Sequence, residues 1–283
     1  MFTRTTSIAA FAALVSTTAL ADGHANLMGY ALAGDGSLLV TMESIAAPGE
    51  AKTHELSARL DAIAYRPVTG DLLGFSREGK IYDVNAATGE LSDLGAAFAE
   101  DAKIEGPAVA FDFNNAIDAV RAVGSDGANL VYFPADFEGE NANTVKRFTD
   151  MFYAEGDSNA GNDPLIYANA YTNAISGAKA GSTAQYALDA RSNALVTVGN
   201  NAGNLGTVGV VTVGGEAVDL VSAGGFDIVS PEEGSDMAYA VLQLEGAETS
   251  GLYTINLETA EATLLSDLGM TGISGFAVSM GGM

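Results

Sequence analysis

The sequence predicts an all-β protein folded as a five-bladed β-propeller of four-stranded antiparallel blades. One observation is a repeated phrase, because residues 81–95 (IYDVNAATGELSDLG) return at 252–269 as LYTINLETAEATLLSDLG. A second is that apolar residues come in short runs separated by Gly, Asn and Asp, without long stretches of helical period. A third is that the two ends of the chain supply complementary parts of one unit. Repetition at long range indicates stacked copies of a single structural unit.

The first 21 residues have the features of a secretory signal. Arg4 provides a basic start, Ile8–Val15 an apolar stretch, and Ala19-Leu20-Ala21 a small-x-small cleavage site. The apolar stretch is too short to span a bilayer, and no Cys is present for lipid attachment or a disulfide. We therefore expect a periplasmic or secreted protein of a Gram-negative bacterium, not inserted in the membrane, with residues 22–283 forming one propeller domain.

The mature chain begins with a unit that lacks its first strand. Three strands are predicted at 27–32, 37–42 and 53–58, with a turn at Asp35-Gly36 between the first two. The last predicted strand, at 273–279, resembles a first strand with nothing after it. One C-terminal strand joining three N-terminal strands would complete the fifth blade and close the ring.

The four units between these ends each contain four short strands. The clearest has strands at 61–65, 71–76, 80–84 and 90–94, joined by connections so short that neighbouring strands must be antiparallel. The others have strands at 108–113, 119–124, 129–133 and 144–148; at 166–171, 184–188, 194–198 and 207–211; and at 225–229, 237–242, 252–256 and 262–266. The first strands align on Ile63, Phe111, Ala170, Phe226 and Phe276.

A two-sheet β-sandwich and an irregular β-solenoid are the alternative architectures. A solenoid usually has shorter and more regular repeats. A sandwich gives no reason for complementary half-units at the two termini, whereas a propeller protects most of its strand edges by closing the ring.

Charge narrows the range of partners. With 12 basic and 36 acidic side chains the net charge is −24, which repels nucleic acid and anionic lipid. The acidity fits a solvated surface suited to salty surroundings, and it also fits the binding of a cation such as calcium. A glycan or a protein remains as a partner.

The chain resembles the DUF4394 family of exported bacterial proteins of uncharacterised function, from about Leu27 to Val278. The most diagnostic stretches are Gly156-Asp157 and Ala170-Tyr171-Thr172-Asn173, which generic propellers lack. Further matching segments are IAYRPVTGDLLGFS (63–76), IYDVNAATGEL (81–91), VAFDFNNAIDAVRAVGSDGANL (109–130) and GLYTINLETAEATLL (251–265). The resemblance implies the fold and export rather than an activity.

Catalysis or zinc binding by histidine or cysteine is not expected. The only two histidines are His24 and His54, both expected at the surface, so a Ser/His/Asp triad or a zinc site has no basis. Carboxylates are the remaining reactive groups. Asp112 and Asp227 occupy the same position of two first strands, on the opposite face from their apolar neighbours.

Two interpretations of these aspartates stay open. They could point into the channel as the acid and base of a glycosidase. They could instead hydrogen-bond neighbouring backbone and hold the blades in register, which we favour. A calcium site in the loop 156–164 is a weaker hypothesis, because the oxygen ligands of Asp157, Asn159, Asn162 and Asp163 lie close in sequence but lack EF-hand spacing.

The predicted function is that of a non-enzymatic binding or scaffold propeller of the bacterial envelope or extracellular matrix, without a cofactor. The alternative is a carboxylate-based, glycan-active hydrolase with its site at the propeller channel.

Overall fold

The computed structural model describes residues 24 and 26–281. The predicted signal segment lies outside these residues. Apart from two short 3₁₀ helices, η1 (Pro48–Glu50) and η2 (Asn200–Ala202), the elements of the described chain are strands. Within this part of the chain, no helix is long and apolar enough to cross a membrane.

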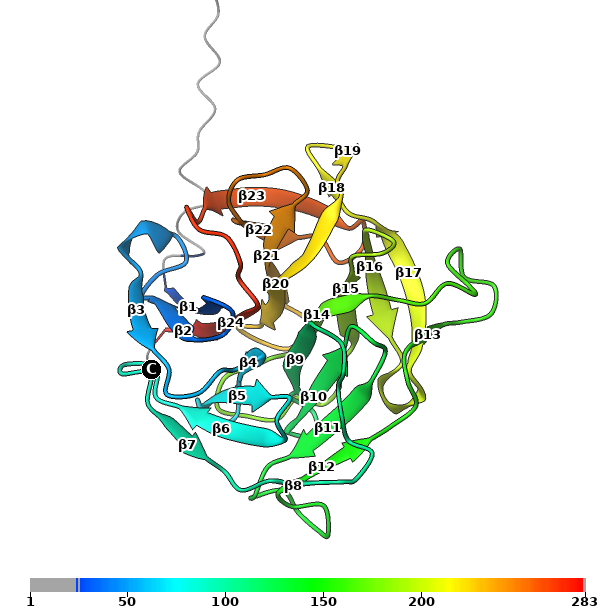
Figure 1. Ribbon diagram of the computed structural model, residues 1–283. Coiled ribbons are helices and arrows are strands. Elements are labelled where there is room, and N and C mark those ends of the chain that lie inside the picture. The colour runs from blue at the N-terminus through cyan, green and yellow to red at the C-terminus, as the bar shows by residue number, and fades with distance from the viewer. Residues whose placement is uncertain (1–23, 25, 282–283) are drawn as a thin grey trace, which may run out of the picture.

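Five small sheets stand around a central axis and form a five-bladed propeller (Figure 1). Blade 1 contains β4 (Ala62–Tyr65), β5 (Leu72–Ser76), β6 (Lys80–Val84) and β7 (Leu91–Asp93). Blade 2 contains β8 (Ala97–Phe98), β9 (Val109–Asn114), β10 (Ala119–Gly124), β11 (Asn129–Phe133) and β12 (Thr144–Arg147). Blade 3 contains β13 (Phe152–Tyr153), β14 (Ile166–Tyr171), β15 (Gln185–Asp189), β16 (Ala194–Val198) and β17 (Asn204–Val210). The predicted fold class is confirmed.

Blade 4 is the largest sheet. It contains β18 (Thr212–Val213), β19 (Glu216–Ala217), β20 (Leu220–Val229), β21 (Met237–Leu244), β22 (Gly251–Ile255) and β23 (Glu261–Asp267). The closing blade contains β24 (Gly275–Met280), β1 (Leu27–Ala33), β2 (Leu38–Met42) and β3 (Lys52–Glu55), in that order from the channel outwards.

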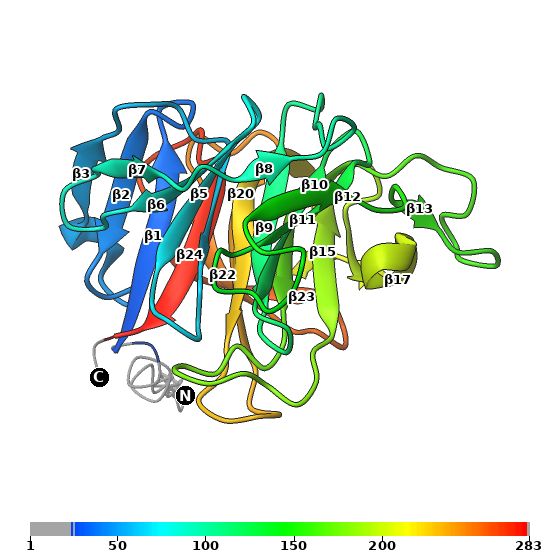
Figure 2. The same ribbon diagram turned by 90° about the horizontal axis from the view of Figure 1, so that it is seen from below.

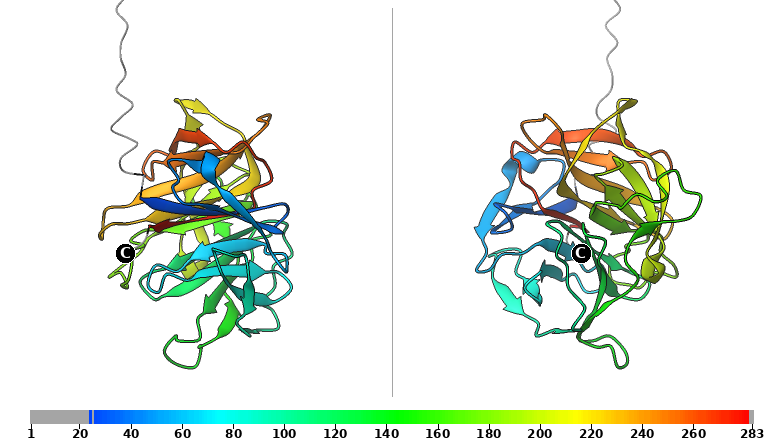
Figure 3. Two further views of the ribbon diagram at one scale, coloured as in Figure 1. Left: turned by 90° about the vertical axis from the view of Figure 1, so that its left-hand side faces the viewer. Right: turned by 45° about the vertical axis from the view of Figure 1, so that its right-hand side comes forward.

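The closing blade joins the two ends of the chain as the sequence predicts. β24 pairs antiparallel with β1 from Gly275–Leu32 to Met280–Leu27. The red and blue strands lie side by side in Figure 2 and in both views of Figure 3. Since β24 is the innermost strand of this sheet, the last strand of the chain seals the ring from the inside.

Three blades have more strands than the four that the sequence predicts. β8, β13 and β18 pair in parallel with the outermost strands β12, β17 and β23, and β19 adds a hairpin to β18. Each parallel strand belongs to the connection that enters its blade, and this connection runs along the outer edge before turning in towards the channel (Figure 1). It thereby covers backbone groups that an edge strand would leave unpaired.

The repeated phrase of the sequence forms the same turn in blades 1 and 4. The side chain of Asn85 accepts hydrogen bonds from the backbone N–H groups of Ala87 and Thr88, at 3.0 and 3.1 Å. Asn256 accepts the corresponding bonds from Glu258 and Thr259, at 2.9 and 3.1 Å. Asparagine stabilises a turn by binding its own backbone in this way, which explains why the two copies share it.

The core lies between neighbouring blades. Phe111 and Phe113 of β9 pack against blade 1, in a cluster with Phe75. Phe226 and Ile228 of β20 pack against blade 3 in the same manner. Because side chains alternate along a strand, the residue between each pair, Asp112 or Asp227, faces the following blade.

Candidate functional site

The channel at the centre of the ring is nearly filled. The five inner strands leave a cavity of about 10 Å³ between them, which is room for about one water molecule. They approach so closely that a Cβ atom on Gly225 of β20 would overlap the backbone of Phe276 on β24. The channel therefore offers no passage, and a ligand of the ring would have to bind at one of its mouths.

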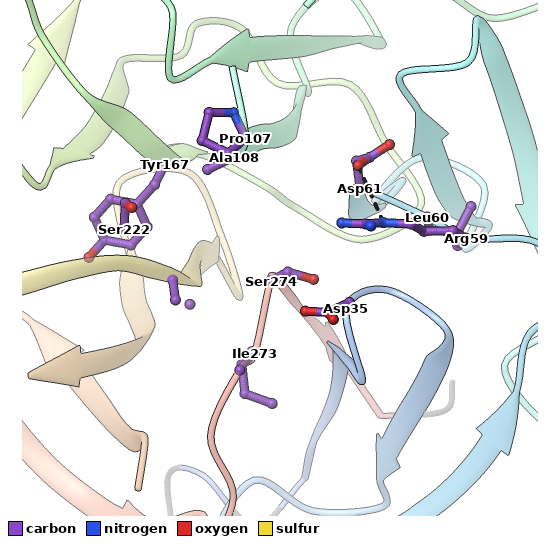
Figure 4. Close-up of a pocket in the computed structure, with 13 residues that line it drawn as sticks. Asp35, Arg59, Leu60, Asp61, Pro107, Ala108, Tyr167, Ser222, Ile273 and Ser274 are labelled. Carbon is purple, nitrogen blue, oxygen red and sulfur yellow. Dashed lines mark ion pairs between the residues drawn. The ribbon is translucent and has the colours of Figure 1, made fainter. Parts of the chain in front are cut away.

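One mouth opens into a depression of about 130 Å³, which we call the mouth pocket. It forms where the β1–β2 turn and the segments that lead into β4 and β24 meet β14 and β20 (Figure 4). Its polar side chains are Asp35, Arg59, Asp61, Tyr167, Ser222 and Ser274. Figure 4 shows Ser274 near the centre, and Tyr167 on the wall opposite Arg59 and Asp61.

The β1–β2 turn is held against the segment that leads into β4. Leu60 donates its backbone N–H to the carbonyl oxygen of Gly36 at 2.9 Å. Gly36 has a φ of +81°, and a Cβ atom at this position would overlap the carbonyl oxygen of Leu60. Only glycine allows this approach. The preceding residue, Asp35, is thereby fixed at the rim with its side chain exposed to solvent.

The charged groups beside this turn are not equally available to a ligand. Asp61 accepts hydrogen bonds from Nε and from the backbone N–H of Arg77, at 2.9 and 2.8 Å, so both of its oxygens are occupied. Arg59 lies 3.8 Å from Asp61, and its side chain is 60% exposed. Arg59 and Asp35 are therefore the groups that can turn towards a bound molecule.

Tyr167 on the far wall and Ser274 near the centre of the pocket each have a polar atom without a partner. Among the described residues, the hydroxyls of Tyr167 and Ser274 are buried and form no hydrogen bond. Asn169 lines the narrow cavity between the inner strands, and both polar atoms of its side-chain amide are also buried without a hydrogen bond. Buried polar groups are nearly always satisfied, and an unsatisfied one costs about 1–3 kcal/mol. Burial also raises the pKa of Tyr167, so its hydroxyl stays neutral.

Asp112 and Asp227 both bind the backbone of the next inner strand. Asp112 accepts a hydrogen bond from the N–H of Tyr171 on β14 at 2.7 Å. Asp227 accepts one from the N–H of Val278 on β24 at 2.6 Å and a second from Ile228 at 2.7 Å. Each carboxyl thus joins two neighbouring blades at the edge of the channel.

Burial dominates the ionisation of these two aspartates. It raises the pKa of Asp227 to about 7, against the lowering effect of the two N–H groups. It also raises the pKa of Asp112 well above its ordinary value, with repulsion from Asp227 as the second cause. The electrostatic interaction between them indicates that they share one region of the ring, so ionising either one disfavours ionising the other.

Of the four calcium candidates, Asp157 and Asn159 lie together at Thr207 and bind it with their side chains. Asp157 accepts three hydrogen bonds, from the N–H of Asn159 and from the N–H and hydroxyl of Thr207, at 2.8, 2.6 and 2.7 Å. These bonds tie the loop to β17. Asn162 and Asp163 are exposed. Over residues 24 and 26–281, no three His, Cys, Asp or Glu side chains are grouped as metal ligands would be.

The two histidines are partly exposed. His24 is half-buried, and its Nδ1 lies 2.7 Å from the hydroxyl of Tyr239. Burial lowers the pKa of His24. His54 lies on β3 and is also half-buried. Both side chains keep part of their surface exposed, and His54 lies on the outermost strand of the closing blade.

Two larger cavities lie elsewhere. The opposite mouth, of about 310 Å³, is lined by Tyr30, Tyr65 and Ser176 among others. A cavity of about 350 Å³ between blades 1 and 2 surrounds Arg66. That guanidinium is already paired, with Asp118 at 2.6 Å and Asp136 at 2.8 Å. The mouth pocket differs from both because its buried hydroxyls have no partner.

The fold and these cavities define a five-bladed propeller without an open channel. A family model described as "Domain of unknown function (DUF4394)" matches residues 41–277. The chain belongs to this family, and the resemblance seen in the sequence is confirmed. No curated protein matches the chain.

Three solved structures show a distant resemblance to the chain. A protein of unknown function from Bacteroides thetaiotaomicron is 13% identical, over 75% of this chain and 52% of its own, with a TM-score of 0.46. The WD40 repeats of RRP9 are 12% identical over 88% of this chain and 66% of theirs, with a TM-score of 0.38. PorZ, a surface component of the type-IX secretion system of Porphyromonas gingivalis, is 13% identical over 84% of this chain and 27% of its own, with a TM-score of 0.38. The chain spans about half the length of the Bacteroides protein.

Proposed function

We propose that the protein is an exported, non-enzymatic binding or scaffold propeller of the bacterial envelope or extracellular matrix. The observation that supports this most is the use made of Asp112 and Asp227. Both carboxyls bind backbone N–H groups of the next blade, and the cavity that Asp227 lines is only about 10 Å³. Groups that hold the ring together in this way are poorly placed to attack a substrate.

Export is part of the proposal and rests on the sequence. The basic start, apolar stretch and small-x-small site within residues 1–21 are typical of a secretory signal. The net charge of −24 favours a glycan or protein partner over nucleic acid or anionic lipid. We propose no cofactor, and calcium only as a weak ligand of the loop 156–164.

A carboxylate-based hydrolase acting on glycans is the second candidate. The raised pKa of Asp112 and Asp227 favours it, because catalytic acids are often carboxyls that burial keeps protonated. A glycosidase also needs two carboxyls, separated by roughly 5–10 Å, on either side of a bound sugar. The cavity that Asp227 lines holds about one water molecule, which leaves no room for that sugar.

The two functions are separated by an activity screen on the mature chain. We expect no release of reducing ends from neutral or acidic polysaccharides, and retardation of the protein in gels that contain a bound polysaccharide. Turnover by the wild type that disappears in Asp112→Asn or Asp227→Asn would establish the hydrolase instead. Cell fractionation tests export, and recovery of the uncleaved chain in the cytoplasm would contradict it.

A further inference from the structure

We propose that the mouth pocket binds a neutral polyhydroxyl compound, namely a single sugar ring at the end of a glycan. This rests on the proposed binding function and names its site and ligand class. The argument uses the unpartnered hydroxyls of Tyr167 and Ser274, the opposing Asp35 and Arg59, and the size of the pocket.

The hydroxyls provide the first step. Tyr167 is 2% exposed and Ser274 is half-buried, and neither hydroxyl has a hydrogen-bond partner among the described residues. Both amide atoms of Asn169, 1% exposed, lie unpartnered in the constriction below. Each hydroxyl can donate and accept. Both hydroxyls are closed to solvent in the unliganded protein, so each side chain must turn towards a bound ligand. A ligand that carries hydroxyls would then supply the missing partners, at a place where leaving them unmade is unfavourable.

The facing wall provides complementary groups. The carboxylate of Asp35 can only accept hydrogen bonds and the guanidinium of Arg59 can only donate them. In Figure 4, Asp35 and Ser274 lie close to each other at the centre of the pocket, below Arg59. A sugar hydroxyl can donate to Asp35 while it accepts from Arg59 or Ser274, which a purely anionic or purely cationic group cannot do.

Charge and size narrow the ligand further. Asp35 and Asp61 stand beside Arg59 and Arg77, so the charges around the pocket balance, and it is the net charge of −24 on the whole protein that disfavours an anionic sugar. The pocket of about 130 Å³ is smaller than the roughly 300–1,000 Å³ of sites for drug-sized ligands. The filled channel closes it below. One ring can enter end-on, whereas an internal stretch of a polymer cannot pass.

The test uses saturation-transfer NMR and calorimetry on the mature chain with glucose, galactose, mannose and N-acetylglucosamine, and with glucuronate as the anionic comparison. We expect at least one neutral sugar to bind and glucuronate to bind more weakly. Tyr167→Phe and Ser274→Ala should each weaken binding about tenfold or more. Tyr167→Phe should leave the Tm unchanged or higher, because it removes a buried hydroxyl that has no partner.

Ser176→Ala is the matched control, since Ser176 lines the opposite mouth and its substitution should leave sugar binding unchanged. Sugar binding that survives Tyr167→Phe and Ser274→Ala overturns the assignment to this pocket. If no monosaccharide binds while the protein is still retarded by a polysaccharide, the inference fails and the proposed binding function stands. Hydrolysis in the activity screen, with sugar binding lost in Tyr167→Phe, would overturn the non-enzymatic function and leave the pocket assignment intact.

Discussion

The carboxyl of Asp227 accepts the backbone N–H of Val278 at 2.6 Å, and so joins blade 4 to the strand that closes the ring. Its other oxygen accepts the N–H of Ile228 at 2.7 Å. The related residue Asp112 makes one such bond, to Tyr171. The bond from Ile228 lies within β20, so each aspartate makes one bond across its seam, and the same position of two inner strands fastens two different seams of the propeller.

Asp227→Asn should destabilise the protein more than Asp112→Asn. An asparagine amide has one acceptor oxygen, so at position 227 its NH₂ group must face a backbone N–H, whereas at position 112 the single bond can be kept. We expect a loss of about 1–3 kcal/mol for Asp227→Asn and less than about 1 kcal/mol for Asp112→Asn. Urea unfolding at pH 7 measures both. Equal losses would show that the second bond at position 227 contributes nothing.

Stability should fall as the pH rises from about 4 towards 7. A carboxyl whose pKa is raised in the folded protein, as for Asp227 at about 7, binds its proton more tightly there than in the unfolded chain. Its contribution is fully present below the unfolded pKa of about 4 and is lost as the pH rises through the folded pKa. Asp112 acts in the same direction. Thermal unfolding at constant ionic strength between pH 5 and 8 measures the slope.

The variant Asp227→Asn is the control for that slope, because an amide does not titrate. The decrease in Tm between pH 5 and 8 should be smaller in the variant than in the wild type. Identical slopes would assign the pH dependence to groups other than Asp227, of which Asp112 is one.

Deleting residues 272–283 should prevent the ring from closing. The deletion removes β24, exposes the edge of β1 and uncovers Tyr239 and Val241, which pack against Phe276 in one cluster. We expect aggregation, or a loss of several kcal/mol that lowers the Tm by roughly 10 °C or more. A synthetic peptide of residues 272–283 should restore a cooperative transition in part. A truncated protein that melts cooperatively at the wild-type temperature would refute this account of closure.

Asn85→Ala and Asn256→Ala should have nearly equal effects. Each substitution removes the two hydrogen bonds that form the turn between the third and fourth strands of its blade. We expect each to cost about 1 kcal/mol, and the double variant to show the sum, because the turns belong to different blades. Chemical denaturation of the three variants provides the comparison, and a clearly non-additive double variant would be evidence against independent blades.

Calcium should raise the Tm little beyond sodium at matched ionic strength. A cation bound only by the folded protein stabilises it by RT ln(1 + [L]/Kd), about 2.7 kcal/mol at a hundredfold excess over Kd. The carboxylate of Asp157 is already engaged by Asn159 and Thr207, so Asp157→Ala should lower the Tm with or without calcium. A calcium-specific rise of many degrees that vanishes in Asp157→Ala would identify a metal site.

The sequence predicts the parts of the fold that depend on local pattern. Alternation around Phe111 and Phe226 places Asp112 and Asp227 on the correct faces, and the repeated turns at Asn85 and Asn256 fix the blade unit. The outer strands β8, β13 and β18 are missed because they have two residues each and gain their pairing from another part of the chain.

The mouth pocket could not be predicted from local sequence pattern. Asp35, Tyr167 and Ser274 lie far apart in the sequence and meet only after the ring has closed. A bulge between Ile166 and Ala168 also interrupts the alternation, so Tyr167 faces blade 4 together with its neighbour Ala168. The Asp35-Gly36 turn was the one available signal, and it indicates a turn rather than a site.

The place of β24 in the closing blade also has a consequence for biosynthesis. Blades 1 to 4 can form as the chain emerges, but β1 must wait for a partner made some 250 residues later. Until then the nascent protein holds three strands of an unfinished sheet and cannot become a closed disc. A chain that crosses a membrane from its N-terminus would thus reach its stable form only on the far side, after its last strand had arrived. Ring closure would then mark the end of transport.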